Sequence, residues 1–177
     1  MKKQKEKKKK KQKEAYIPKK GLTGQGNDYH VYVMEPKEKL TAFALGFGGA
    51  LLVSWVFFKL PLLSAAAGIG AGILIQKYYG AYLCEKRKIT LLLQFRDMLE
   101  SLTSSYSSGK NTNGAFADAY GDMVQIYGEK ADIAQELKII LTGVNSNMNV
   151  EALLADFADR SELTDVKSFA DVFEVSV

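Results

Sequence analysis

The sequence predicts an all-α protein in which a transmembrane helical hairpin is followed by a cytoplasmic antiparallel bundle of about five helices, the last one incomplete. Two observations favour this fold class. Two uncharged apolar runs, 41–58 and 60–76, are separated only by Lys59. From Ile89 to Val175, apolar residues recur every three or four positions, with short breaks and no alternation typical of strands.

The charge of the chain is unevenly distributed and divides it into three parts. Residues 1–40 contain 13 lysines and 5 acidic residues, a net charge of +8, whereas residues 89–177 contain 6 basic and 14 acidic residues, a net charge of −8. We therefore predict a disordered basic leader at 1–39, the hairpin at 40–83 and a helical domain at 89–177. The lysine run at 1–14 has no aromatic residues among its lysines, which argues against nucleic-acid binding. It is either a solvated tail or a contact for anionic lipid.

The two apolar runs have the length of membrane spans. Each contains 17 or 18 residues, which makes about 26 Å of helix and is enough for the hydrocarbon core of a bilayer. Lysine and arginine flank both outer ends, so the positive-inside rule places both chain ends in the cytoplasm. Two glycine groups are predicted to let the helices approach closely: Gly46, Gly48 and Gly49 in the first run, and Gly68, Gly70 and Gly72 in the second.

Local signals divide the acidic part into helices. A first helix from Ile89 is predicted to stop near Gly109, and a second runs from an Asn113 cap to Tyr127. A third ends before Gly143, Asn149 caps a fourth, and a fifth starts near Thr164. The first helix should face the core with one apolar stripe: Ile89, Leu92, Phe95, Leu99, Leu102 and Tyr106. The fifth lacks a stop signal, so we expect another chain or a further segment to cover its apolar side.

The sequence contains no recognisable catalytic or metal-binding motif. His30 is the single histidine and has no ligand cluster around it, and Cys84 is the single cysteine, either a small apolar filler or an acylation site. Asp118 with Asp122 could hold a cation, but so many acidic residues produce such pairs by chance. We therefore predict no enzyme activity, no cofactor and no metal.

Two blocks of the acidic part resemble the type II secretion system F domain, in its TadB/TadC-like branch of pilus-assembly platform proteins. The first block is residues 95–102 (FRDMLESL) with Ser107–Gly109 and Ala115–Phe116, and the second is Glu136–Leu137 and Gly143 with residues 151–160 (EALLADFADR). Arg96 stands where the family usually has proline. The usual final helix and closing membrane segments are absent, so the chain resembles a C-terminally truncated member.

This resemblance implies a component of a Tad-like pilus or type II secretion machine in the bacterial plasma (inner) membrane. It implies a hexameric secretion ATPase, a paralogous platform subunit and pilins as partners, and a homo- or hetero-oligomer. We predict partner contacts at Arg96, Asp97, Glu136 and Arg160, with salt bridges inside the bundle as the alternative for each. The competing interpretations are a membrane-tethered adaptor or signalling protein and a small pore-forming hairpin protein.

Overall fold

The computed structural model describes residues 19–30, 32, 34–58 and 61–176; for 54–58, 61–72, 74, 76, 77 and 176 it describes only the helical backbone. Within these residues the fold is all-helical, as the sequence predicts, and contains no strand. The helices are α2 (Pro36–Phe58), α3 (Pro61–Ser107), α4 (Thr112–Tyr127), α5 (Asp132–Asn145), α6 (Val150–Ser161) and α7 (Thr164–Ser176).

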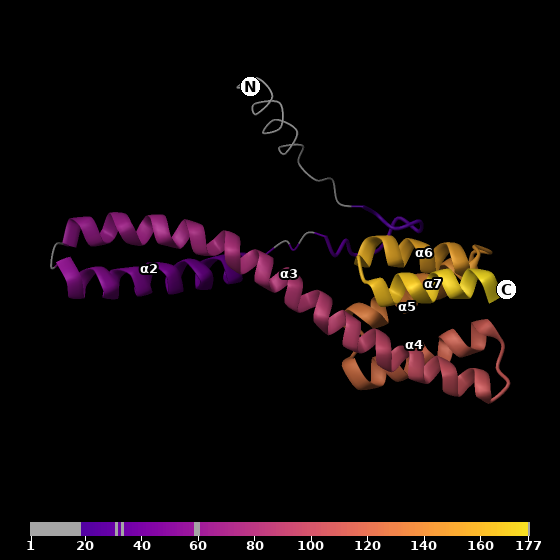
Figure 1. The fold of residues 1–177 in the computed structure, drawn as a ribbon. Helices are drawn as coiled ribbons and strands as arrows, with labels where there is room; N and C mark the ends of the chain where they lie inside the picture. The colour runs from indigo at the N-terminus through magenta and orange to yellow at the C-terminus, as the bar shows by residue number, and fades with distance from the viewer. Residues whose placement is uncertain (1–18, 31, 33, 59–60, 177) are drawn as a thin grey trace, which may run out of the picture.

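The molecule has an extended part and a bundle, and α3 belongs to both (Figure 1). The helix α2 lies antiparallel beside the first half of α3, and the second half of α3 packs with α4, α5, α6 and α7. Within the described part of the chain, no helix combines the length and the apolar composition that crossing a bilayer requires.

The helix α3 is one unbroken element of 47 residues, about 70 Å long at 1.5 Å per residue. The boundary predicted between residues 83 and 89 is therefore not a break in the backbone. Residues 81–107 contain no glycine or proline, the residues at which helices most often bend sharply. One helix therefore runs through both the hairpin and the bundle, and Figure 1 shows it changing direction where it leaves α2.

The side of α3 that faces the core differs from the predicted stripe. Phe95 and Leu102 are buried as predicted, but Ile89 and Tyr106 are exposed, and Leu91 and Met98 are buried beside Phe95. The apolar residues of α3 occupy more than one side, and the position of α5 to α7 decides which side is covered. Aromatic contacts complete the core, with Phe95 against Phe157 and Phe169, and Phe116 against Phe173.

The ends of α3 and α4 follow from local backbone chemistry. Gly109 has φ +79°, and its N–H donates to the carbonyl of Tyr106 while the N–H of Lys110 donates to that of Ser105. This is the Schellman arrangement, which confirms Gly109 as a helix terminator. The cap of α4 is Asn111, whose side chain accepts from the N–H of Gly114 at 2.9 Å, so the prediction of Asn113 is wrong.

Gly143 does not terminate a helix, contrary to the prediction. It is buried inside α5, and a Cβ at this position would lie 2.6 Å from Cδ1 of Leu153 on α6. The missing side chain is therefore what allows α5 and α6 to approach. The starts of α6 after Asn149 and of α7 at Thr164 are as predicted, although the side chain of Asn149 makes no capping hydrogen bond.

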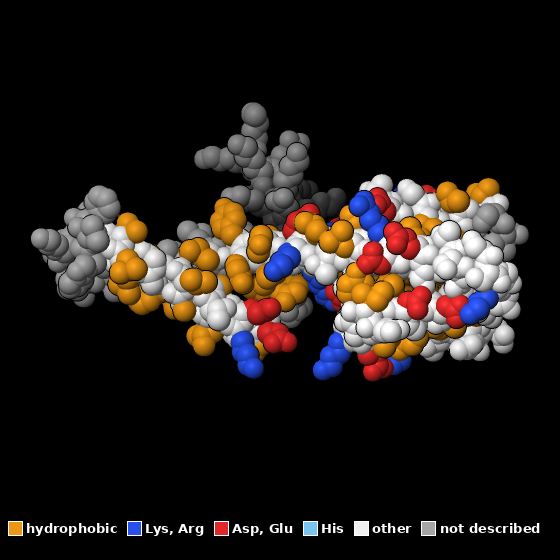
Figure 2. Space-filling view, turned by 90° about the horizontal axis from the view of Figure 1, so that it is seen from below, with side chains coloured by type: hydrophobic (Ala, Val, Ile, Leu, Met, Phe, Trp, Pro, Cys, Tyr) orange, Lys and Arg blue, Asp and Glu red, His pale blue; other side chains and the backbone are white. Residues whose placement is uncertain are grey.

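The described side chains of the hairpin are largely apolar and exposed. Figure 2 shows apolar side chains over the hairpin and charged ones from its neck across the bundle. Gly46 is buried, but a Cβ at Gly48 or Gly49 would meet open space, so these two do not form the contact between α2 and α3. The surroundings of Gly68, Gly70 and Gly72 lie outside the described residues.

Candidate functional site: a charged junction between hairpin and bundle

Arg160 and Glu136 form a buried ion pair at the centre of the bundle. Arg160 lies in the last turn of α6 and Glu136 in α5, and their side chains are 2% and 1% exposed. Two guanidinium nitrogens donate to the two carboxylate oxygens, at 2.8 and 2.7 Å. This bidentate geometry is the strong form of a charge-assisted hydrogen bond.

Two further donors of Arg160 are also used. Its Nε donates to Asp156 at 2.9 Å, and its Nη1 donates to the carbonyl of Asn27 at 3.0 Å. Burial by itself would lower the pKa of Arg160, but the hydrogen bonds and charges of Glu136 and then Asp156 outweigh it and raise the pKa. The guanidinium therefore stays charged and joins α5, α6 and the N-terminal segment.

Residues 19–30, which we call the strap, pack against the bundle. Tyr29 is 2% exposed, its hydroxyl donates to Glu136 at 3.0 Å, and its N–H donates to the carbonyl of Arg160 at 3.1 Å. Burial, followed by the charge of Glu136, raises the pKa of Tyr29. At the far end of the strap, Lys19 pairs with Asp159 at 2.5 Å. The prediction of a disordered leader at 1–39 is therefore wrong for residues 19–30 and for 36–39, which begin α2; residues 1–18 lie outside the described part.

Arg87 joins α3 to this network. Its Nε and Nη2 donate to Asp132 at the start of α5, at 2.8 and 2.5 Å, and its guanidinium lies 4.8 Å from the ring centroid of Tyr29. The hydrogen bond with Asp132 is the main reason that the pKa of Arg87 is raised. A bidentate ion pair and a cation–π contact thus fix α3 against both α5 and the strap.

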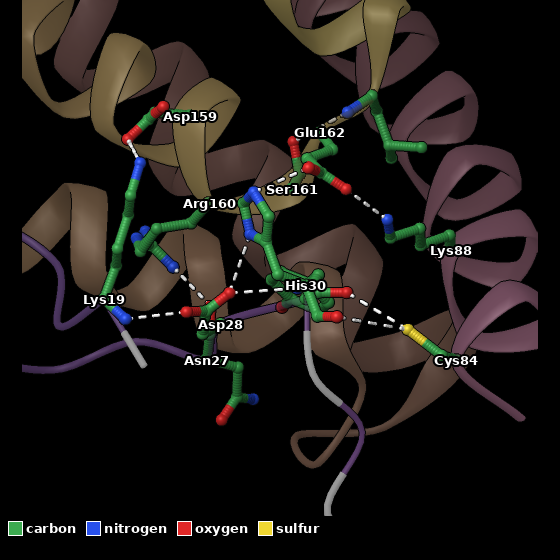
Figure 3. Close-up of polar contacts among 12 residues, drawn as sticks. Lys19, Asn27, Asp28, His30, Cys84, Lys88, Asp159, Arg160, Ser161 and Glu162 are labelled. Atoms are coloured by element: carbon green, nitrogen blue, oxygen red, sulfur yellow. Dashed lines mark hydrogen bonds and ion pairs between the residues drawn. The ribbon is translucent and has the colours of Figure 1, made fainter. Parts of the chain in front are cut away.

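Glu162 forms a second set of contacts, between the strap, α3 and the α6–α7 turn (Figure 3). Its carboxylate lies 2.8 Å from Nε2 of His30 and 2.6 Å from Nζ of Lys88, and Nδ1 of His30 lies 2.8 Å from Asp28. The hydrogen bond from Lys88 lowers the pKa of Glu162. Glu162 has φ 55°, a left-handed backbone conformation that is costly for a residue other than glycine.

Cys84 lies beside this second set. Its thiol is half-buried and donates to the carbonyl of Tyr29 at 3.3 Å. The thiol therefore fills a gap and binds the strap, which agrees with the structural alternative for this residue. We call the Arg160–Glu136 pair, Tyr29, the Arg87–Asp132 pair and the Glu162 contacts the junction.

The chemistry of the junction is that of attachment. Each charged group described above faces a group of opposite charge or a hydrogen-bonding partner. Within the described residues, no group of three or more His, Cys, Asp or Glu side chains is placed to hold a metal ion. A groove of ≈ 750 Å³ lies beside the junction between α6 and α7, lined by residues that include His30, Glu162 and Lys167.

The four predicted partner contacts divide into two kinds. Glu136 and Arg160 are buried and bound to each other, so the prediction that they contact a partner is wrong, and the alternative of a salt bridge inside the bundle applies. Arg96 is exposed and pairs with Asp165 of α7 at 3.3 Å, and Asp97 accepts a hydrogen bond from the hydroxyl of Tyr127. Their role in partner binding stays a prediction.

Sequence reasoning missed Tyr29, His30, Arg87 and Glu162. None of them belongs to a local motif. Arg87 and Asp132 are 45 residues apart in the sequence, and Tyr29 and Glu136 are 107 residues apart.

Comparison of the chain with family models, with curated proteins and with solved structures finds no match.

Proposed function

We propose that this chain is a non-enzymatic platform component of a Tad-like pilus or type II secretion machine in the bacterial inner membrane. In this proposal α2 and the first half of α3 cross the membrane, and both chain ends lie in the cytoplasm. The bundle receives motion from a hexameric secretion ATPase and passes it to pilin assembly, together with a paralogous platform subunit.

The observation that carries the proposal is the continuity of α3. One helix of 47 residues runs from the apolar hairpin into the core of the bundle. Between Ala81 and Ser107 it has no glycine or proline, the residues at which helices most often bend sharply. A force on the bundle would therefore displace the hairpin directly, which is what a coupling protein requires.

The junction supports the same function because it ties the other hairpin helix, α2, to the bundle. The strap is held by Tyr29 and by the carbonyl of Asn27, and α2 begins at Pro36, only six residues after His30. Both helices of the hairpin are thus attached to the bundle, one through α3 itself and one through the strap.

The surface of the hairpin supports a membrane location. The sequence places two uncharged apolar runs there, and several of its described apolar side chains are exposed, which is unfavourable in water. They are Leu40, Leu45, Leu52, Val53 and Ile73. Lysines and arginine at the outer ends of both runs support cytoplasmic chain ends.

The charge of the bundle supports a basic partner surface. Residues 89–177 have a net charge of −8, and complementary charge raises the association rate and selects the partner. Exposed Arg96 and half-buried Asp97 are the residues that we expect at this contact, because Glu136 and Arg160 are buried.

The proposal is tested with the full chain expressed in a bacterium that carries a Tad-like system. A Gly-Ser-Gly-Ser insertion after Glu85 interrupts α3 between hairpin and bundle, and the same insertion after Glu129 lengthens a surface turn as the matched control. We expect the first insertion to retain the ATPase in co-purification but to abolish pilus assembly, and the control to retain both. Unchanged assembly with the insertion after Glu85 would refute coupling through α3.

Membrane insertion is measured separately by extraction with alkaline carbonate. A chain that stays in the membrane fraction but never co-purifies with the ATPase would favour the membrane-tethered adaptor instead. A chain that carbonate extracts would refute the transmembrane hairpin.

A further inference from the structure

A line of exposed apolar side chains follows one side of α3 from the hairpin to the bundle. Its members recur at intervals of three, four and seven residues, which places them within an arc of about 60° on a helix with 3.6 residues per turn. The line extends over 19 residues, and the 18 helical steps between its ends make about 27 Å. We call it the α3 stripe: Ile75, Tyr78, Tyr82, Ile89 and Leu93.

The α3 stripe is not part of the core of this chain. The buried residues of the same helix, Leu91, Phe95 and Met98, point to the opposite side, toward α5 to α7. Ile89 and Leu93 are 53% and 55% exposed although both lie in the part of α3 that packs with the bundle. Their exposure to water opposes the hydrophobic effect, so a second surface that covers them would be stabilising.

A lipid bilayer does not cover the whole stripe. Tyr78 and Tyr82 are of the residue type that is enriched at membrane interfaces. Ile89 and Leu93, however, lie beyond the charged residues Lys86, Arg87 and Lys88, which mark the aqueous side of such an interface. A partner that contacts the full stripe must therefore be a protein that runs along α3 on both sides of this charged neck.

We propose that the α3 stripe binds the α3 stripe of a second copy of this chain, parallel to it and related by a two-fold axis. The stripe positions 75, 78, 82 and 89 have the spacing of the a and d positions of a coiled coil, and Leu93 lies four residues beyond Ile89, beside this seam. A two-fold axis along the stripe places each residue opposite or next to its own copy, so the surface must be self-complementary.

The charges along the stripe meet this requirement. Glu85 and Lys86 are adjacent, exposed and opposite in charge. In a pair of parallel helices, Lys86 of one copy lies near Glu85 of the other. Each acidic residue that the pairing brings together therefore has a basic residue of the other copy beside it.

The bundle end of the stripe is widened by α4. The hydroxyl of Tyr127 donates to Asp97, one turn after Leu93, and both Ile126 and Tyr127 are exposed there. This adds apolar surface beside Leu93. The parallel orientation rests on the proposed function, in which both hairpins lie in one membrane, whereas the pairing of the stripes does not.

The test uses disulfide cross-linking of the full chain, because its single cysteine can be removed with Cys84→Ser. In that background Tyr82→Cys or Ile89→Cys is oxidised with copper phenanthroline, and Ser168→Cys on the exposed side of α7 is the matched control. We expect covalent dimers with each of the two stripe variants and monomers with the control. Equal dimer yields in stripe and control variants would overturn the proposal.

Orientation is tested by mixing chains with Tyr78→Cys and chains with Leu93→Cys. Cross-links between two copies of the same variant support parallel pairing, and cross-links only between the two different variants overturn it. As a second measurement, Ile89→Asp/Leu93→Asp should convert the dimer to a monomer in light scattering with unchanged helical circular dichroism. A persistent dimer would contradict the stripe as the interface, whether or not the chain is found in the membrane fraction.

Discussion

Arg160 and Glu136 share two hydrogen bonds in the interior of the bundle, where both side chains are at most 2% exposed. Two charges removed from water cost more than their mutual attraction returns unless every remaining donor and acceptor is satisfied. Here Asp156 and the carbonyl of Asn27 accept from two further donors of Arg160, and the hydroxyl of Tyr29 donates to Glu136. The strap is thus required for the ion pair, and the ion pair holds the strap.

Breaking this pair from one side should strongly destabilise the fold. We expect Arg160→Met to lower the free energy of unfolding by about 3–5 kcal/mol, because it leaves the Glu136 carboxylate buried without its cation. Urea unfolding followed by circular dichroism measures the loss. The double variant Arg160→Met/Glu136→Leu should cost less than the sum of the two single changes, and simple additivity would contradict the pairing.

The exposed pair of Arg96 and Asp165 is the matched control. Its side chains are 60% and 47% exposed, and the closest atoms are 3.3 Å apart. We expect Arg96→Met to change the free energy of unfolding by less than about 1 kcal/mol, since water and salt screen such pairs. A loss of stability as large as that expected for Arg160→Met would mean that the exposed ion pair contributes as much as the buried one.

Gly143 should not tolerate a side chain. Gly143→Ala places a methyl group 2.6 Å from Cδ1 and 3.2 Å from Cγ of Leu153, which is itself buried. We expect destabilisation by about 1–3 kcal/mol, the usual cost of overpacking. Gly121→Ala is the control, because a Cβ there meets open space in a helix, and it should stabilise by about 0.4–1 kcal/mol. Thermal unfolding of the two variants should therefore shift in opposite directions.

Gly109 and Gly143 show how far the sequence alone predicts this fold. Gly109 was predicted correctly because a terminating glycine is recognised from its own neighbours, and the same holds for the start of α7 at Thr164. Gly143 also follows an apolar stripe, but its role depends on Leu153 in another helix. The neighbours of a residue in the sequence contain no information on how closely α5 and α6 approach. A glycine after an apolar stripe therefore marks a helix end at Gly109 but a contact between helices at Gly143.

The junction was beyond sequence reasoning for the same physical reason. The strap is rich in glycine and polar residues, and Tyr29 is its one large buried side chain. Its burial depends on Glu136 and Arg160, which come more than 100 residues later. The rotation of α3 likewise depends on where α5 to α7 pack, so Ile89 was placed in the core and is exposed.

Tyr29 should account for much of the attachment of the strap. Tyr29→Phe removes a hydrogen bond to a charged group and should cost about 1.5–3 kcal/mol, whereas Tyr29→Ala also removes a buried ring and should cost about 3–5 kcal/mol. Hydrogen exchange of the strap measures the effect locally. The amide of Gly24, which donates to the carbonyl of Gly21, should exchange faster in Tyr29→Ala. Unchanged exchange would show that the strap is held elsewhere.

The pair of Lys88 and Glu162 should contribute to stability within a defined pH window. The hydrogen bond from Lys88 lowers the pKa of Glu162 below its ordinary value of 4.5, so this contribution is present above pH 4.5 and is lost as the pH falls through the lowered pKa. Burial alone would lower the pKa of Lys88, but the hydrogen bond and charge of Glu162 outweigh it and raise the pKa above 10.5. The contribution of charged Lys88 is lost only as the pH rises through this raised pKa.

The variant Lys88→Met isolates this pair, because it leaves the contact between Glu162 and His30 in place. The stability difference between the parent chain and Lys88→Met should be constant between about pH 5 and 10 and should decline on both sides, since either partner then loses its charge. Urea midpoints across the pH range measure it, with Lys167→Met as the control for general charge effects. A difference that persists unchanged at pH 3 would mean that the aliphatic part of Lys88, and not its charge, joins α3 to the α6–α7 turn.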